Sequence, residues 1–111
     1  ALDFVMWCGP CHGRRGEGNG PIAAQLQTSP PDLTEIQKRA GGTFPTDMIR
    51  ARIDGREQPQ AHGTQEMPAW GYWFNLQATG GGLIEEGEQS AKEEVQARID
   101  QLVLFLQTLQ K

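Results

Sequence analysis

The chain contains 111 residues, of which 37% are hydrophobic and 22% charged, and its formal net charge at pH 7 is -4. This length predicts a single domain covering residues 1–111, and an acidic chain without a basic stripe argues against nucleic acid as a partner. With three Val and six Ile against 14 Gly and 7 Pro, the composition favours short helices joined by loops over a β-rich core.

Short elements are expected in the first half of the chain. Residues 1–8 fit either a helix or a strand, whereas residues 9–21 contain five Gly and two Pro and are predicted to be loop. Three short helices should follow, because each combines apolar residues with a start or stop signal. They are residues 22–26 after Pro21, residues 33–40 before two glycines, and residues 46–54 before Gly55.

The second half is predicted to be loop from residue 56 to residue 82, apart from one candidate turn at 71–77, and then a long helix. Ser90 with Glu93 three residues later forms a capping-box pattern, after which apolar residues recur at helical spacing. These residues are Val95, Ile99, Leu102, Leu106 and Leu109. The longest apolar run, 102–106, is far shorter than the ~20 residues of a membrane span, so no span is expected.

The clearest chemical motif is C-x-x-C-H at residues 8–12, the attachment signature of c-type haem. Two thiols three positions apart can each form a thioether with a haem vinyl group, and the next residue can then direct an imidazole onto the iron. We therefore expect one covalent haem c, attached through Cys8 and Cys11, with His12 as an iron ligand.

The same residues also allow a different interpretation, because WCGPC resembles the active site of thioredoxin. In that case Cys8 would be a low-pKa nucleophile and Cys11 the resolving thiol of a thiol–disulfide oxidoreductase. Only seven residues precede Cys8, and the downstream sequence lacks the alternating strands of a thioredoxin sheet. Zinc is a further alternative, but the motif has no matching second pair of ligands.

A low-spin haem used for electron transfer needs a second axial ligand, usually Met or His. The candidates are Met6, Met48, Met67 and His62. Met6 lies too close to Cys8 to reach the opposite haem face, and Met48 is predicted to be a core residue of a helix. Met67 stands in a loop stiffened by Pro68 and is the predicted ligand, with His62 as its alternative. Without Met67 the open iron would favour a haem enzyme or gas sensor.

Four features together resemble class I bacterial cytochrome c: C-x-x-C-H-G near the N-terminus, PPDLT, MPAWG and an amphipathic C-terminal helix. This resemblance implies an all-α fold of short helices and loops wrapped around one haem. It also implies that the Pro31 carbonyl accepts a hydrogen bond from His12 Nδ1 and that Leu33 packs on the haem. Trp70 and Arg56 are the candidates to meet the haem propionates.

The resemblance further implies an electron carrier of a respiratory chain rather than an enzyme, with His12 and Met67 as the iron ligands. The expected partners are a periplasmic dehydrogenase, for instance a molybdenum-dependent sulfite dehydrogenase, and a terminal oxidase. In bacteria, attached haem c implies assembly in the periplasm, so we expect export and removal of a signal peptide. Two features depart from the family: the helix before Cys8 is short, and the stretch 72–88 is longer than a minimal member needs.

Overall fold

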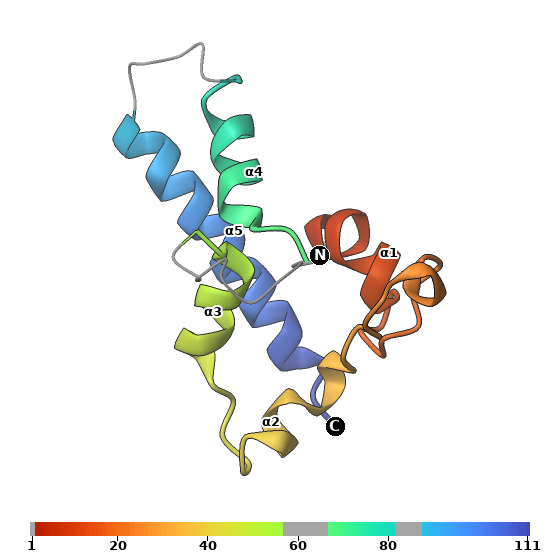
Figure 1. Ribbon diagram of the computed structural model, residues 1–111. Helices are drawn as coiled ribbons and strands as arrows, with labels where there is room; N and C mark the ends of the chain where they lie inside the picture. The colour runs from red at the N-terminus through yellow and green to blue at the C-terminus, as the bar shows by residue number, and fades with distance from the viewer. Residues whose placement is uncertain (1, 57–66, 82–87) are drawn as a thin grey trace. The chain divides into compact units, whose positions relative to one another are not determined.

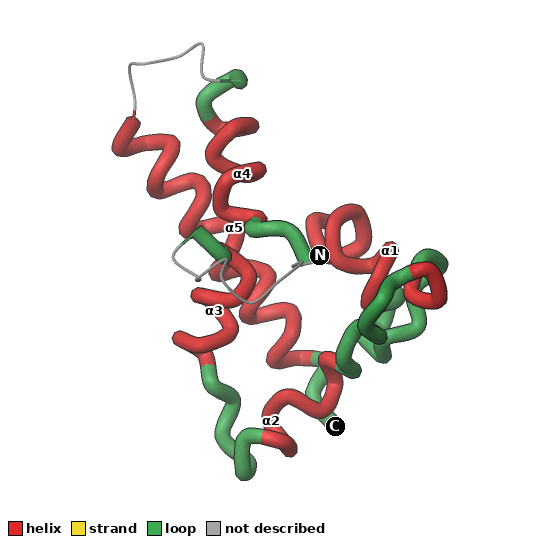
Figure 2. Tube along the Cα trace, in the orientation of Figure 1, coloured by secondary structure: helices red, strands yellow, loops and turns green. Residues whose placement is uncertain are grey.

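The computed structural model describes residues 2–56, 67–81 and 88–111. Within these residues every regular element is helical (Figure 2), so the all-α fold class is confirmed for this part of the chain. The α-helices, labelled in Figure 1, are α1 (Gly9–His12), α2 (Ile36–Arg39), α3 (Thr46–Asp54), α4 (Trp70–Ala78) and α5 (Glu88–Thr108). A π-helix at Phe4–Cys8 and 3₁₀ turns at Ala23–Gln25 and Leu33–Glu35 complete the set.

The N-terminal residues form one helical segment that runs from Leu2 to His12 and contains the π-helical stretch. The prediction of loop from residue 9 onward is therefore wrong for Gly9–His12. Pro10 stands in the first turn of α1, where its missing N–H does not interrupt the hydrogen-bond pattern. Gly9 and Pro10 lie inside the helical segment and do not end it, and the loop begins at Gly13.

The chain forms two compact units, which we describe separately. The first unit comprises residues 1–46 and 102–111. Its core contains Phe4, which is 1% exposed and whose ring centroid lies 4.9 Å from that of Phe105 near the end of α5. Leu102, Val103 and Leu106 on the same part of α5 are also buried. The helical segment that carries the C-x-x-C-H motif is thus anchored by an aromatic contact to the C-terminal end of the chain.

The second unit comprises residues 47–101 and contains most of α3, all of α4 and the first part of α5. Phe74 is fully buried in this unit, and the guanidinium carbon of Arg98 lies 3.9 Å from the centroid of that ring. Arg50 of α3 donates from Nε to Asp100 of α5 at 2.7 Å. A cation–π contact and an ion pair therefore supplement the apolar packing between these helices. Other buried apolar residues in the described part of this unit are Ile53, Ala91, Val95 and Ile99.

The predicted helix at 46–54 is confirmed as α3. The candidate turn at 71–77 is instead part of a full helix, α4, which also replaces neighbouring residues of the predicted loop. The C-terminal helix is also confirmed, but it begins at Glu88 rather than after Ser90. Ser90 therefore lies inside the first turn of α5. Met48 was expected in the core, but its side chain is 63% exposed on α3.

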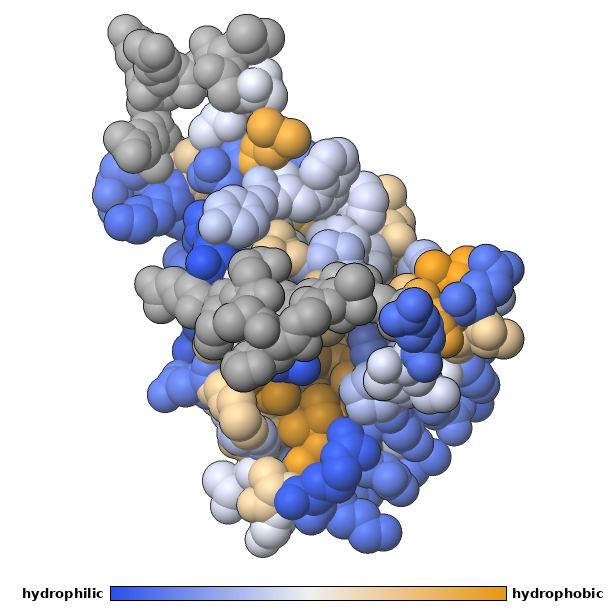
Figure 3. Space-filling model, in the orientation of Figure 1, coloured by the Kyte–Doolittle hydropathy of each residue, from blue (hydrophilic) through white to orange (hydrophobic). Residues whose placement is uncertain are grey.

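Hydrophilic residues predominate on the face seen in the space-filling view, and hydrophobic ones occupy smaller separate areas (Figure 3). None of the helices in the described ranges has the length and apolar character required to cross a bilayer.

Candidate functional site

The residues of the C-x-x-C-H motif lie together at the end of the N-terminal helical segment. Cys8 is the last residue of the π-helical stretch, and Cys11 and His12 belong to the following turn, α1. Cys8 and His12 are buried, with 8% and 7% of their surface exposed, and Cys11 is half-buried. The two cysteines are not joined by a disulfide. One short helix therefore presents two thiols and an imidazole.

His12 is held in one state by its surroundings. Its Nδ1 donates a hydrogen bond to the carbonyl oxygen of Pro31 at 3.2 Å, which fixes the tautomer with the proton on Nδ1. Burial lowers the pKa of His12 below its usual 6.5, and the bond to Pro31 opposes this shift. Among the residues that the structure describes, Nε2 has no hydrogen-bond partner. The lowered pKa favours the neutral ring at pH 7, and no described residue occupies the lone pair on Nε2.

The glycine-rich loop after the motif folds back onto the end of α1. Three of its N–H groups donate to the last carbonyls of the motif: Gly18 to His12 at 2.7 Å, Gly20 to Cys11 at 3.0 Å, and Ile22 to Pro10 at 3.0 Å. These bonds satisfy carbonyl groups that a helix end leaves free. A Cβ atom at Gly20 would overlap the carbonyl of Pro10, so this close approach of two backbones requires glycine.

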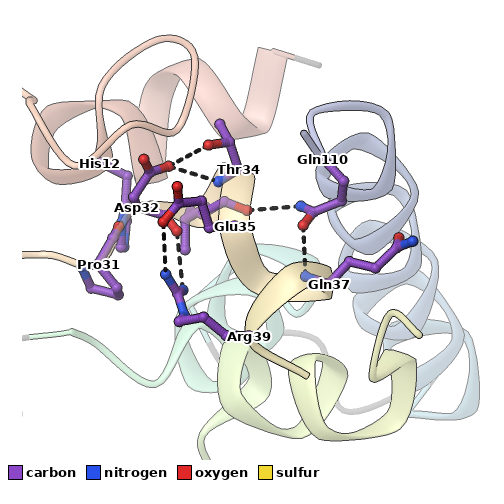
Figure 4. Close-up of polar contacts among 9 residues, drawn as sticks. His12, Pro31, Asp32, Thr34, Glu35, Gln37, Arg39 and Gln110 are labelled. Carbon is purple, nitrogen blue, oxygen red and sulfur yellow. Dashed lines mark hydrogen bonds and ion pairs between the residues drawn. The ribbon is translucent and has the colours of Figure 1, made fainter. Parts of the chain in front are cut away.

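The segment that contains Pro31 is braced from two directions (Figure 4). Asp32 Oδ1 accepts hydrogen bonds from the N–H of Thr34 at 2.9 Å and from its hydroxyl at 2.6 Å. Gln110 Nε2 donates to the carbonyl of Leu33 at 2.7 Å, and Gln110 Oε1 accepts from the N–H of Gln37 at 2.8 Å. The carbonyl that orients His12 thus belongs to a stretch fixed by its own turn and by the C-terminal end of the chain.

The geometry around Cys8 does not favour a thioredoxin-like dithiol. Burial raises the pKa of the Cys8 thiol to about 12, with smaller contributions from the nearby Asp3 carboxylate and Cys11. Helical residues precede Cys8 from Leu2 onward, so Cys8 does not occupy the free helix N-terminus where thiol pKa values are lowered. The described residues also contain no strand that could form part of a thioredoxin sheet. A buried thiol with a raised pKa is a poor nucleophile at neutral pH.

The donor set fits a covalently attached haem. Cys8 and Cys11 are free thiols on one helical segment, and His12 next to them is neutral, with Nδ1 held by a backbone carbonyl and Nε2 available. Metal-binding histidines usually have this arrangement, in which the second ring nitrogen donates to a carbonyl that fixes the ring.

The other predicted residues are distributed between the two units. Leu33 lies in the first unit, half-buried, and its N–H donates to the carbonyl of Gly16 at 2.6 Å. Arg56 and Trp70 lie in the second unit. Arg56 forms a two-pronged ion pair with Asp54, through Nε at 2.6 Å and through the terminal nitrogen at 3.2 Å. Trp70 begins α4 and stacks on Phe74, with centroids 6.1 Å apart.

Among the axial-ligand candidates, Met67 also lies in the second unit, half-buried, three residues before α4 begins. Met6 and Met48 are largely exposed on helices, at 50% and 63%. The alternative ligand His62 falls outside the described residues.

Sequence reasoning missed the residues that brace the site. The bond between Asp32 and Thr34 has a readable signal, because an Asp two residues before a Thr at the start of a helical turn is a common cap. Gln110 has no such signal, since it is 77 residues away from the carbonyl that it contacts. Neither was among the predicted site residues.

No group of three or more His, Cys, Asp and Glu side chains that could hold a metal ion occurs in the part of the chain that the structure describes. Comparisons of the chain with protein-family models, with curated proteins and with solved structures find no match.

Proposed function

We propose that this chain is a single-haem cytochrome c of the class I type that transfers one electron at a time between partner proteins. The observation that carries the proposal is the state of His12. It directly follows the second cysteine of the motif, and its Nδ1 proton is held by the Pro31 carbonyl, so Nε2 is the ring nitrogen that could bind a metal. A histidine on its own would be weak support, but here it stands beside two free thiols at the spacing of haem attachment.

In this proposal, different residues would attach the haem, bind its iron and orient the ligand. Cys8 and Cys11 would hold the haem through thioethers, each thiol adding across one vinyl double bond without net oxidation or reduction. His12 Nε2 and the Met67 sulfur would be the two axial ligands of the iron. The bound haem supplies an iron that alternates between the ferric and ferrous states. Pro31 would keep His12 oriented, and both neutral ligands would stay in place in the two states.

Location and partners belong to the same proposal. Haem attachment of this kind would place the protein in the bacterial periplasm. There it would accept electrons from a dehydrogenase, such as a molybdenum-dependent sulfite dehydrogenase, and pass them to a terminal oxidase. These partners are inferred by analogy with the family that the motifs resemble, and fold alone does not imply them.

The test is an absorption spectrum of protein produced together with haem-attachment machinery, recorded oxidised and then reduced with dithionite. The wild-type protein should show a sharp α band on reduction and a weak far-red sulfur-to-iron band when oxidised. Met67→Ala should lose the far-red band and keep the haem, whereas His62→Ala should retain both.

The opposite results are equally clear. If the far-red band is lost in His62→Ala and kept in Met67→Ala, the assignment of the second ligand is wrong. A protein without haem and with two titratable thiols would contradict the cytochrome and favour the thiol–disulfide oxidoreductase.

A further inference from the structure

The end of α3 and the start of α4 meet in an unusually close backbone contact, which we call the α3–α4 junction (residues 54–56 against residues 69–71). Gly55 ends α3 with a φ of +70°, and a Cβ atom at this position would lie 2.7 Å from the Cα of Ala69 and 2.8 Å from its Cβ. No side chain can be added there without displacing Ala69. The two segments are therefore in direct contact at the one residue of the α3 end that has no side chain.

A second contact of the junction places an ion pair over α4. Asp54 and Arg56, on either side of Gly55, form the two-pronged pair, with 20% and 28% of their side chains exposed. A Cβ atom at Gly71 would overlap Asp54 Oδ1 and lie 2.5 Å from Arg56 Nε. The first turn of α4 therefore admits this ion pair because residue 71 is glycine, and Gly55 and Gly71 each permit one contact of the same junction.

The junction lies immediately downstream of Met67. Only Pro68 separates Met67 from Ala69, the residue that Gly55 contacts. Pro68 has a fixed φ, so little backbone freedom lies between the methionine and the contact. We propose that the α3–α4 junction is a positioning device for Met67 that holds its thioether on the haem iron against competing ligands. This inference rests on the proposed function, in which Met67 is an axial ligand.

The physical reason is preorganisation. A ligand on a fixed backbone loses little conformational freedom when its bond to the metal forms, so the bond stays closed for a larger fraction of the time. When the backbone is loosened, the open fraction rises, and an external ligand binds more tightly in the same proportion. The apparent affinity of the ferric protein for imidazole therefore reports how firmly the chain holds Met67.

The main test compares Gly55→Ala with Gly41→Ala in the haem-loaded protein. Gly41 has a φ of +86° and nothing within 4 Å of its Cβ position, so this control also places a side chain at a positive φ but creates no close contact. Gly55→Ala should bind imidazole about tenfold more tightly than Gly41→Ala, the change expected if roughly one backbone residue regains its freedom. The far-red band of Gly55→Ala should weaken in parallel.

A second pair of variants perturbs the backbone less and keeps the test valid if Gly55→Ala fails to fold. Asp54→Asn removes the charge of the junction ion pair, and Glu35→Gln does the same to the exposed pair of Glu35 and Arg39, which are 3.9 Å apart. Imidazole should bind more tightly to Asp54→Asn and equally to Glu35→Gln and the wild type. If Gly55→Ala and Asp54→Asn bind imidazole no more tightly than their controls, the junction has only a structural role and the inference is overturned.

Met67→Ala separates this failure from a failure of the proposed function. Its iron should bind imidazole more tightly than that of any junction variant, because it has no internal ligand to displace. If Met67→Ala binds imidazole like the wild type, Met67 is not the ligand, and the assignment of the axial ligand and the inference are overturned together.

Discussion

At the scale of single residues, His12 illustrates how burial and one hydrogen bond determine the state of an imidazole. Burial lowers its pKa, and the carbonyl of Pro31 keeps the remaining proton on Nδ1. At neutral pH the ring therefore needs to release no proton before Nε2 can bind a metal. The orientation of the ring depends on the position of the Pro31 carbonyl, so the residues that fix Pro31 also determine how His12 can bind a metal.

Asp32, the neighbour of Pro31, leads to a prediction of pH dependence. Hydrogen bonds from the hydroxyl and the N–H of Thr34 hold the pKa of the Asp32 carboxyl below its usual 3.8. The folded state thus favours the ionised form, and its stabilising effect is full above 3.8 and disappears as the pH falls through the lower folded pKa. Asp32→Asn should therefore destabilise the haem-loaded protein at pH 7, and its deficit should shrink at pH 3.

Urea unfolding at both pH values measures this difference. Asp47→Asn is the control, because the Asp47 side chain is 98% exposed and its pair with Arg50 should contribute little. A deficit in Asp32→Asn that is the same at pH 7 and pH 3 would show that the carboxylate has no part in the effect.

At the scale of elements, the C-terminal end of the chain supports the loop that orients His12. Gln110 bonds to the carbonyl of Leu33, the N–H of Gln37 and the carbonyl of Leu106. Gln110→Ala removes the side-chain partner of the Leu33 carbonyl and of the Gln37 N–H, whereas the Leu106 carbonyl keeps its bond from the Leu109 N–H. The substitution should lower the free energy of unfolding by about 2 kcal/mol. Because the loop carries Pro31, the reduction potential should change as well.

Gln107→Ala serves as the matched control for this variant. Gln107 is exposed and makes one 3.3 Å hydrogen bond, to the hydroxyl of Thr46, so its loss should change stability by no more than about 0.5 kcal/mol. Chemical unfolding measures the stability of both variants, and a redox titration measures their reduction potentials. Equal effects of the two substitutions would mean that Gln110 does not support the loop.

The elements also show what sequence pattern can and cannot predict. Helix α3 occupies the predicted residues because Thr46, the apolar spacing and Gly55 are all local signals. Helix α4 was missed because its sequence, WGYWFNLQA, has a weak apolar period and a glycine near its start. Its stability comes from distant residues instead, since Arg98 lies over Phe74 and donates to Gln77 at 2.7 Å. Contacts of this kind leave no trace in a local window.

At the scale of the whole molecule, charge is unevenly distributed along the chain. Residues 1–56 contain seven basic and six acidic side chains, whereas residues 57–111 contain three basic and eight acidic ones. Arg14 and Arg15 are exposed directly after the motif. Such charges affect the rate of encounter between redox partners more than the strength of binding.

Replacing Arg14 and Arg15 together by glutamine should slow electron transfer to an acidic partner several-fold at low ionic strength. The difference should vanish at high salt, where exposed charges are screened. Arg52→Gln, an exposed arginine of α3, is the control. Stopped-flow kinetics at several salt concentrations measures these rates. If the double variant and the wild type transfer electrons at the same rate at every salt concentration, Arg14 and Arg15 play no part in docking the partner.

The candidate site was predictable to the extent that its chemistry is contiguous in the chain. Cys8, Cys11 and His12 lie within five residues, so the sequence alone could single them out as a candidate site for haem attachment. The hydrogen bond between His12 and Pro31 is the one expected from the resemblance. The supports of the site come from residues far apart in the chain, as the contact between Phe4 and Phe105 illustrates. Such partners become visible only when the fold brings them together.

The most direct test of the haem proposal is the intact mass of the protein, produced with haem-attachment machinery and measured under denaturing conditions. We predict that the wild-type chain gains the mass of one haem, that the mass is carried by a peptide containing Cys8 and Cys11, and that the double variant Cys8→Ser/Cys11→Ser does not gain it. A wild-type chain of unmodified mass, with both thiols titratable, would contradict the account.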